Sequence, residues 1–220
     1  MHHEKILILG ATGRTGHLFL QLALKAGFQV NVLVRNTEIF KINHSNLAVF
    51  QGTPTNKELL RTAMKGCRAV VSALNVSRIS DFPWAKLRSP ENFLSETIMN
   101  VAGLCKDLDI NRVIILSAWG VGDTRKDIPG WFRWLIDHST IRIAYQDHNR
   151  QEQILAASDL RYTIIRPAGL TNFKNAKNIT VSLKNKPKTS LTISRKDVAQ
   201  FILMVLEQEL YIRESPVIST

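Results

Sequence analysis

The chain has 220 residues, of which 45% are hydrophobic and 21% are charged, so it can bury the core of a globular domain. This composition excludes a disordered tail, a collagen-like rod and a small disulfide-held fold. Lysine and arginine number 29 against 18 acidic residues, which gives a formal net charge of +11. Such an excess fits a nucleic-acid binder, an enzyme of polyanionic ligands or a solvated basic surface, and charge alone does not choose between them.

Short apolar runs alternate with longer amphipathic stretches along the chain. The runs predict strands at Lys5–Leu9, Gln29–Val34, Leu47–Gln51, Ala69–Leu74, Arg112–Leu116 and Tyr162–Arg166. The stretches predict helices at Thr15–Ala26, Asn56–Met64, Pro90–Asp107, Tyr145–Ala157 and Arg195–Gln208. Strands with so little polar alternation are typical of a parallel sheet that is buried on both faces. We therefore predict one α/β domain over residues 1–220, with a doubly wound parallel sheet and helices on both faces.

Loops that follow the strands are the expected substrate side, because ligands of open α/β sheets bind outside the carboxyl ends of strands. These loops are 75–89, 118–139 and 171–190. The first two contain the aromatic residues Phe82, Trp84, Trp119, Trp131, Phe132 and Trp134. The third contains Lys174–Lys188, which has five lysines and no acid and is either a flap or a solvated hairpin.

Cysteine usage and hydropathy indicate the compartment. Cys67 and Cys105 lie far apart without a CxxC spacing, so we expect neither a metal site nor a disulfide. No apolar run reaches the roughly 18–20 residues of a membrane span, and the run that ends at Gly10 is too short for a signal peptide. We expect a soluble cytoplasmic protein without a membrane partner.

The strongest motif is Gly10-Ala-Thr-Gly13-Arg-Thr-Gly16, which follows the first predicted strand and opens the first predicted helix. Gly10 lets the chain turn off the strand, Gly13 lets a pyrophosphate approach the backbone, and Gly16 lets the helix pack closely on the sheet. The N–H groups of the first helical turn then hold the phosphates. The motif predicts a dinucleotide cofactor.

The end of the second predicted strand indicates which dinucleotide binds. An acidic residue there binds the ribose 2′-hydroxyl of NAD, whereas an arginine accommodates the 2′-phosphate of NADP. The sequence has Arg35 at this point, with no acid before Glu38, and Arg14 in the glycine loop is a second candidate cation. Because a guanidinium forms charge-assisted bonds to phosphate, we predict NADP(H) as the cofactor.

With these motifs the chain resembles the atypical short-chain dehydrogenases, in particular the NmrA-like NAD(P)-binding group. Within that group it is most similar to the type that includes NADPH-dependent flavin reductase and biliverdin-IXβ reductase. The matching stretches include Leu160–Leu170, with its Arg-Pro-Ala-Gly-Leu sequence, and Ile193–Ala199. The resemblance covers nearly the whole chain and implies a Rossmann-like fold.

The resemblance also implies the cofactor contacts. They are Gly10, Thr12, Gly13, Arg14, Thr15, Gly16, Arg35, Thr53, Leu74, Asn75, Ser117, Pro167, Ala168, Gly169 and Leu170. Ser117 and Pro167–Leu170 would lie near the nicotinamide. Thr53 departs from the family pattern, because the family often has an aspartate after the third strand to hold the adenine.

The candidate catalytic residues are Ser117, Tyr145 and His148. Typical short-chain dehydrogenases pair a tyrosine with a lysine four residues later, and the ammonium lowers the pKa of the phenol. Here Asn149 follows Tyr145 at that spacing and brings no charge. His148 lies about where atypical members have a lysine or histidine. Glu152 at i+4 would favour its protonated form on the same helix face, although a surface His–Glu pair is the alternative.

This weak acid–base set favours one reaction type. Hydride transfer to a flavin, quinone or tetrapyrrole depends less on a positioned proton donor, because the planar acceptor delocalises the charge. The aromatic loops suit such an acceptor, and the basic surface suits an anionic one. We expect an NADPH-dependent reductase of a planar conjugated acceptor, acting as a monomer or weak dimer. The alternative is a non-catalytic NADP(H)-binding redox sensor that signals to a protein partner; a nucleic-acid role rests on charge alone and is not expected.

Overall fold

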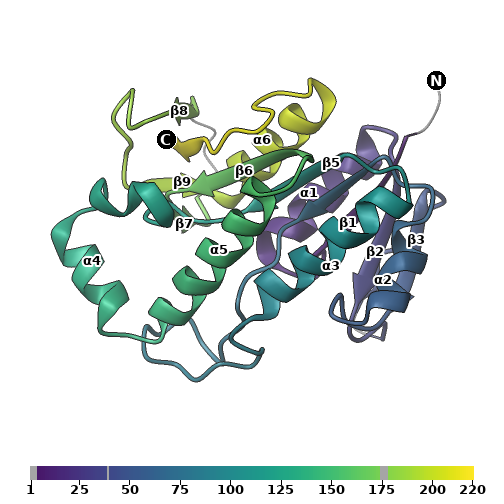
Figure 1. Ribbon diagram of the computed structural model, residues 1–220, viewed down its shortest axis with the longest axis horizontal. Helices are drawn as coiled ribbons and strands as arrows, with labels where there is room; N and C mark the ends of the chain where they lie inside the picture. The colour runs from purple at the N-terminus through teal and green to yellow at the C-terminus, as the bar shows by residue number, and fades with distance from the viewer. Residues whose placement is uncertain (1–3, 39, 174–177) are drawn as a thin grey trace.

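The computed structural model describes residues 4–38, 40–173 and 178–220, and its central feature is a twisted sheet covered by helices (Figure 1). The described strands of this sheet are β1 (Lys5–Leu9), β2 (Gln29–Val34), β3 (Leu47–Gln51), β4 (Ala69–Ser72), β5 (Arg112–Leu116), β6 (Arg161–Pro167), β8 (Thr180–Ser182) and β10 (Val217–Ser219). Their order is β3-β2-β1-β4-β5-β6-β10-β8. All neighbours from β3 to β10 pair in parallel, and β8 pairs antiparallel with β10. The predicted doubly wound α/β fold is confirmed, with one antiparallel strand at its edge.

The helices form a layer on each face of the sheet. They are α1 (Arg14–Lys25), α2 (Lys57–Met64), α3 (Phe93–Asp107), α4 (Gly130–Asp137), α5 (Ile141–Ala156) and α6 (Arg195–Glu207). In Figure 1, α3 and α5 lie in front of the sheet and α1 and α6 behind it. Alternate residues of β1 divide between the layers: Ile6 and Ile8 join the core under α1 and α6, and Leu7 and Leu9 join the core under α2, α3 and α5.

The periodicity of α6 explains how one such helix forms and packs. Its apolar residues at i, i+3 and i+4 spacing are all buried, namely Val198, Phe201, Ile202, Val205 and Leu206. The helix begins after Ser194, whose hydroxyl accepts a hydrogen bond from the Asp197 backbone N–H at 3.1 Å. This is the N-cap that satisfies an otherwise unpaired first-turn amide. The predicted stripe is confirmed.

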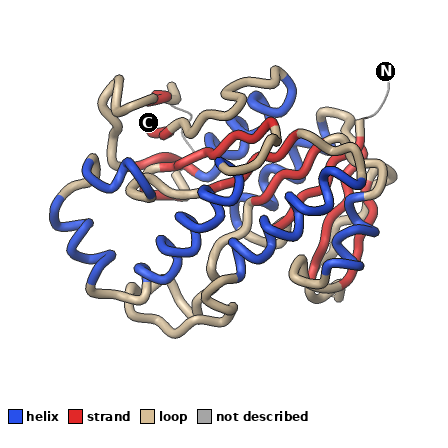
Figure 2. Tube along the Cα trace, viewed as in Figure 1, coloured by secondary structure: helices blue, strands red, loops and turns tan. Residues whose placement is uncertain are grey.

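Three expectations about the elements are wrong. Strand β3 lies at the sheet edge and is partly exposed, so it is not buried on both faces. Helix α5 begins at Ile141, four residues before the predicted start, because the chain turns directly from α4 into it. The 118–139 segment is largely helical, with a 3₁₀ turn (η1, Gly122–Lys126) before α4, so Figure 2 draws helix where we expected a loop.

The 171–190 segment contains β8 and lies between two further short strands. A second, two-stranded sheet pairs β7 (Gly169–Thr171) with β9 (Thr192–Ser194), and β8 adds to the edge of the main sheet. Four residues of the expected Lys174–Lys188 segment, 174–177, lie outside the described residues. No helix in the described part of the chain is long and apolar enough to cross a membrane.

Candidate functional site

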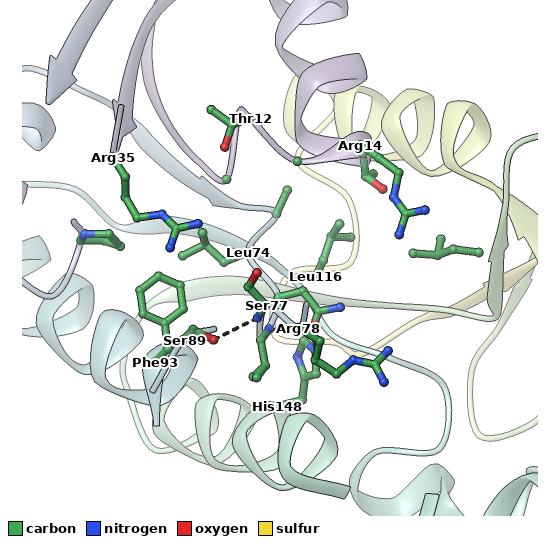
Figure 3. Close-up of a pocket in the computed structure, with 18 of the residues that line it drawn as sticks. Thr12, Arg14, Arg35, Leu74, Ser77, Arg78, Ser89, Phe93, Leu116 and His148 are labelled. Atoms are coloured by element: carbon green, nitrogen blue, oxygen red, sulfur yellow. Dashed lines mark hydrogen bonds between the residues drawn. The ribbon is translucent and has the colours of Figure 1, made fainter. Parts of the chain in front are cut away.

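A pocket of about 450 Å³ opens at the carboxyl ends of the strands (Figure 3). Its wall combines the glycine loop, the end of β2, the segment that follows β4, the end of β5 and one face of α5. In Figure 3, Arg35 lies at one side and Arg14 and Arg78 at the other, with His148 at the base. The lining predicted from the sequence comprises Gly10, Thr12, Gly13, Arg14, Thr15, Arg35, Leu74, Asn75, Ser117, His148, Pro167 and Leu170.

The glycine loop forms the phosphate-binding geometry that its sequence requires. Gly10 has φ +84°, and a Cβ there would lie 2.8 Å from the carbonyl carbon and oxygen of Ala73. A Cβ on Gly16 would lie 2.2 Å from the Gly10 carbonyl oxygen. Gly13 is the N-cap of α1 and brings no side-chain cap, and the first turn contains no acid. The first-turn amides of α1 therefore have neither a side-chain cap nor an acidic residue of their own turn to compete with a bound phosphate.

The two candidate cations for a 2′-phosphate do not lie together. Arg35 follows β2 directly and is exposed at one side of the pocket. Arg14 lies on the other side, where its guanidinium donates two hydrogen bonds of 3.0 and 2.9 Å to the carboxylate of Asp81. The idea that Arg14 adds a second charge beside Arg35 is therefore wrong. Arg14 stays a predicted cofactor contact at the first turn of α1.

Ser117 directly follows β5 and is one of the residues that line the pocket. The residue is 7% exposed, and its hydroxyl oxygen has no hydrogen-bond partner among the described residues. Its backbone N–H is already used, because it donates to the Ile165 carbonyl at 2.8 Å. A buried hydroxyl without a partner costs stability unless a ligand supplies one.

His148 is not the charged residue that we expected. It is 4% exposed, and burial lowers its pKa from the usual value to about 4, with the Asp147 carboxylate acting in the opposite direction. Glu152 does not charge it, because that carboxylate accepts two hydrogen bonds from Arg166. His148 is therefore a neutral imidazole at the base of the pocket, and the expected cationic His148–Glu152 pair is wrong.

Tyr145 does not reach the pocket. Its hydroxyl donates to the Trp119 backbone carbonyl at 3.2 Å, and its ring meets Phe132 edge to face. Burial raises the pKa of its phenol, so the group does not exchange protons near neutral pH. The structure gives no support to Tyr145 as an acid–base residue.

The aromatic residues of the two long segments do not form the pocket wall. Trp119 is buried in the core, whereas Phe82, Trp84, Trp131 and Trp134 are exposed away from the lining. Trp84 donates through its indole N–H to the His138 carbonyl at 2.7 Å, which ties the segment after β4 to the end of α4. Phe93, at the start of α3, is the aromatic residue that the described lining contains. Sequence reasoning missed it because it belongs to a helix.

The predicted contacts Gly16, Thr53, Ala168 and Gly169 are not among the described residues that line the pocket. Thr53 stands between the lining residues Gly52 and Pro54, with its hydroxyl 3.1 Å from that of Thr55. Ala168 is buried, and a Cβ on Gly169 would lie 2.9 Å from the Leu191 carbonyl oxygen, because β7 and β9 run close together there. These residues shape the wall from behind.

The pocket also contains residues that sequence reasoning did not name. They are Ser77, Arg78, Ser80, Asp81, Ser89 and Arg195, together with apolar groups such as Phe93 and Leu116. The Ser77 backbone N–H donates to the Ser89 hydroxyl at 2.9 Å, which closes the segment after β4 into a compact loop (Figure 3). Arg195 belongs to the Ile193–Ala199 stretch that resembles the family, but no sequence pattern indicates that it lines this pocket.

Comparison with known proteins identifies the family and the fold. The sequence profile of a protein family described as NAD(P)H-binding matches residues 10–209. An oxidoreductase of Pestalotiopsis microspora is 27% identical over 178 residues, which cover 74% of this chain and 66% of that protein. A short-chain dehydrogenase/reductase of Veillonella parvula, solved in complex with NADP, aligns with a TM-score of 0.80 at 20% identity, over 99% of this chain and 94% of the other. ChuY of Escherichia coli O157:H7, described as an anaerobilin reductase, aligns with a TM-score of 0.80 at 18% identity, over 98% and 96% of the two chains.

Proposed function

The chain belongs to the NAD(P)H-binding family, and from that premise we propose that it is an NADPH-dependent reductase that transfers hydride to a planar conjugated acceptor. The observation that carries the proposal is one pocket whose lining contains both the glycine loop and Ser117, a residue whose buried hydroxyl has no hydrogen-bond partner among the described residues. The first holds a dinucleotide. The second is a donor for an oxygen or nitrogen of the acceptor.

The choice of NADPH over NADH rests on Arg35. Its guanidinium stands at the end of β2, exposed and on the pocket wall. A 2′-phosphate placed there would gain charge-assisted hydrogen bonds, whereas the bare 2′-hydroxyl of NADH would gain little.

The shortage of protein acids in the pocket supports a conjugated acceptor. Among the described lining residues, His148 is neutral and the Asp81 carboxylate is committed to Arg14. Tyr145 points elsewhere. An acceptor that delocalises the incoming electron pair, such as a flavin, quinone or tetrapyrrole, is reduced without a strong protein acid. The protein then contributes mainly the proximity of the two rings.

Steady-state oxidation of NADPH, followed by its absorbance, tests this function. FMN, a soluble quinone and biliverdin would each be offered with NADPH and with NADH. We expect turnover with at least one acceptor, and faster turnover with NADPH at limiting cofactor. Tight NADPH binding with no turnover on any acceptor would contradict the reductase and support a redox sensor, and equal efficiency with NADH would contradict the role of Arg35.

A further inference from the structure

Hydrogen bonds join the end of β5 to the segment after β4 through two side chains of α5. Gln151 is 1% exposed, and its side-chain nitrogen lies 3.0 Å from the Leu116 carbonyl oxygen and 2.7 Å from Nδ1 of His148. The Leu116 carbonyl can only accept, so the NH₂ group of Gln151 must face it. The second N–H of the same group then points to His148. Nδ1 of His148 is therefore an acceptor and carries no proton.

The proton of the neutral ring consequently sits on Nε2. That atom lies 3.2 Å from Oδ1 of Asn75, and the Val76 backbone N–H donates to the same oxygen at 2.8 Å. Two donors fix the oxygen end of the Asn75 amide. Its NH₂ end makes no hydrogen bond to any described residue, although Asn75 lines the pocket.

The position of Asn75 indicates which part of a bound dinucleotide its amide would contact. Ala73, two residues earlier, contacts the turn at Gly10, where an added Cβ would come within 2.8 Å of it. The loop after β4 therefore starts beside the phosphate-binding turn and continues toward Ser117. A dinucleotide whose pyrophosphate lies on the glycine loop would pass Asn75 with its nicotinamide half.

We propose that Gln151 and His148 are positioning residues, which hold the Asn75 amide so that its NH₂ group donates to a phosphate or ribose oxygen of the nicotinamide half of NADPH. The proposal rests on the proposed NADPH site. In it His148 transfers no proton. The Leu116 carbonyl fixes the orientation of the Gln151 amide, and Gln151 fixes the tautomer of His148. The Nε2–H of that tautomer then fixes the orientation of the Asn75 amide.

The substitution Asn75→Asp tests the orientation. A carboxylate still accepts from His148 and Val76, but it presents an oxygen to the ligand where the amide presented N–H. We expect NADPH affinity, measured by fluorescence titration, to fall at least about tenfold, because a donor becomes a repelling acceptor. Asn111→Asp adds the same charge at an exposed position before β5, at the opposite end of the sheet, and should leave the affinity unchanged.

The role of His148 is tested by a double-mutant cycle. His148→Leu should weaken NADPH binding several-fold in the wild-type background and have no further effect in Asn75→Ala, since it acts only through that amide. A ¹⁵N–¹H spectrum of the folded protein should show the His148 proton on Nε2, and Gln151→Glu should move a proton onto Nδ1. Thermal melting of each variant shows that it is folded.

The proposal is overturned by equal NADPH affinity in Asn75→Asp and Asn111→Asp, by additive effects in the cycle, or by a wild-type proton on Nδ1. A fall in kcat for His148→Leu with unchanged NADPH affinity would instead make His148 an acid, and would also overturn it. Wild-type protein that does not bind NADPH overturns the proposed function together with this inference, so the two failures are distinguishable.

Discussion

Arg166 on β6 holds the carboxylate of Glu152 on α5 through two hydrogen bonds, of 3.1 Å from Nε and 2.6 Å from Nη2, and both side chains are 7% exposed. Asp123, from the turn after β5, accepts a third bond from the same guanidinium at 2.7 Å. This pair ties a strand, a helix and a turn together behind the pocket. It also engages both carboxylate oxygens of Glu152, and neither of them is hydrogen-bonded to His148 in the described part of the chain.

Glu152→Ala should destabilise the protein by about 3–5 kcal/mol, because it leaves a buried guanidinium with one exposed partner. Urea unfolding followed by circular dichroism measures this. Glu91→Ala removes an exposed carboxylate next to α3 and should change the stability by less than about 0.5 kcal/mol. Equal effects in the two variants would show that the ion pair contributes no more than a surface charge.

Arg35→Ala should weaken NADPH binding by about 10–100-fold and leave NADH binding nearly unchanged, since the two ligands differ only at the 2′-phosphate. Calorimetric titration with both dinucleotides gives the ratio. Because the side chain is exposed, the variant should fold normally. An unchanged ratio of affinities would place the phosphate elsewhere.

Gly16→Ala should abolish NADPH binding and lower the melting temperature, because the new Cβ would lie 2.2 Å from the backbone oxygen of Gly10. Gly103→Ala is the control. It lies within α3 with nothing within 4 Å of its added Cβ, so it should stabilise the protein by about 0.5–1 kcal/mol. A folded Gly16→Ala protein with normal affinity would show that the turn relaxes freely.

Ser117→Ala should separate stability from activity. Removing a buried hydroxyl that has no partner among the described residues leaves the melting temperature equal or higher. Loss of a donor to the acceptor should lower kcat/KM about 10–100-fold with unchanged NADPH affinity. A variant that loses stability and keeps its activity would mean that the hydroxyl is structural.

Because His148 is neutral in the folded protein, the free energy of unfolding should depend on pH. Its pKa is about 4 in the folded protein and about 6.5 in an unfolded chain, so the unfolded state binds more protons between these values. The free energy of unfolding should therefore decrease as the pH falls from 6.5 to 4, by about 3 kcal/mol from this group. Urea unfolding at pH 7 and 4.5 should show a smaller decrease in His148→Leu. The same decrease in both proteins would contradict the lowered pKa.

Local sequence signals predicted much of this protein. Strands β1, β2, β3 and β5 begin and end at the predicted residues, because each is a short apolar run between polar segments. The expected NAD(P)-binding family is confirmed. The glycine loop indicated it because the loop combines three backbone requirements in seven residues. Helix α4 was missed, since it has only eight residues and exposes Trp131 and Trp134.

The errors at the site concern contacts between distant elements. His148 and Glu152 do lie one helical turn apart, but this spacing does not show what else each residue contacts. Arg166, on β6, donates hydrogen bonds to the carboxylate of Glu152, and Gln151 is hydrogen-bonded to the imidazole of His148. Arg166 and the Leu116 carbonyl, which orients Gln151 toward His148, meet α5 only when the helix lies on the sheet.

The position of strand β10 in the sheet affects how the chain folds during its synthesis. Residues 217–219 insert between β6 and β8, and Val217, Ile218 and Ser219 are all buried. During synthesis these two flanking strands leave the ribosome without the neighbour that they share. A nascent chain stalled before residue 217 should therefore hold the glycine-loop half in native form while its last strands stay open to chaperones.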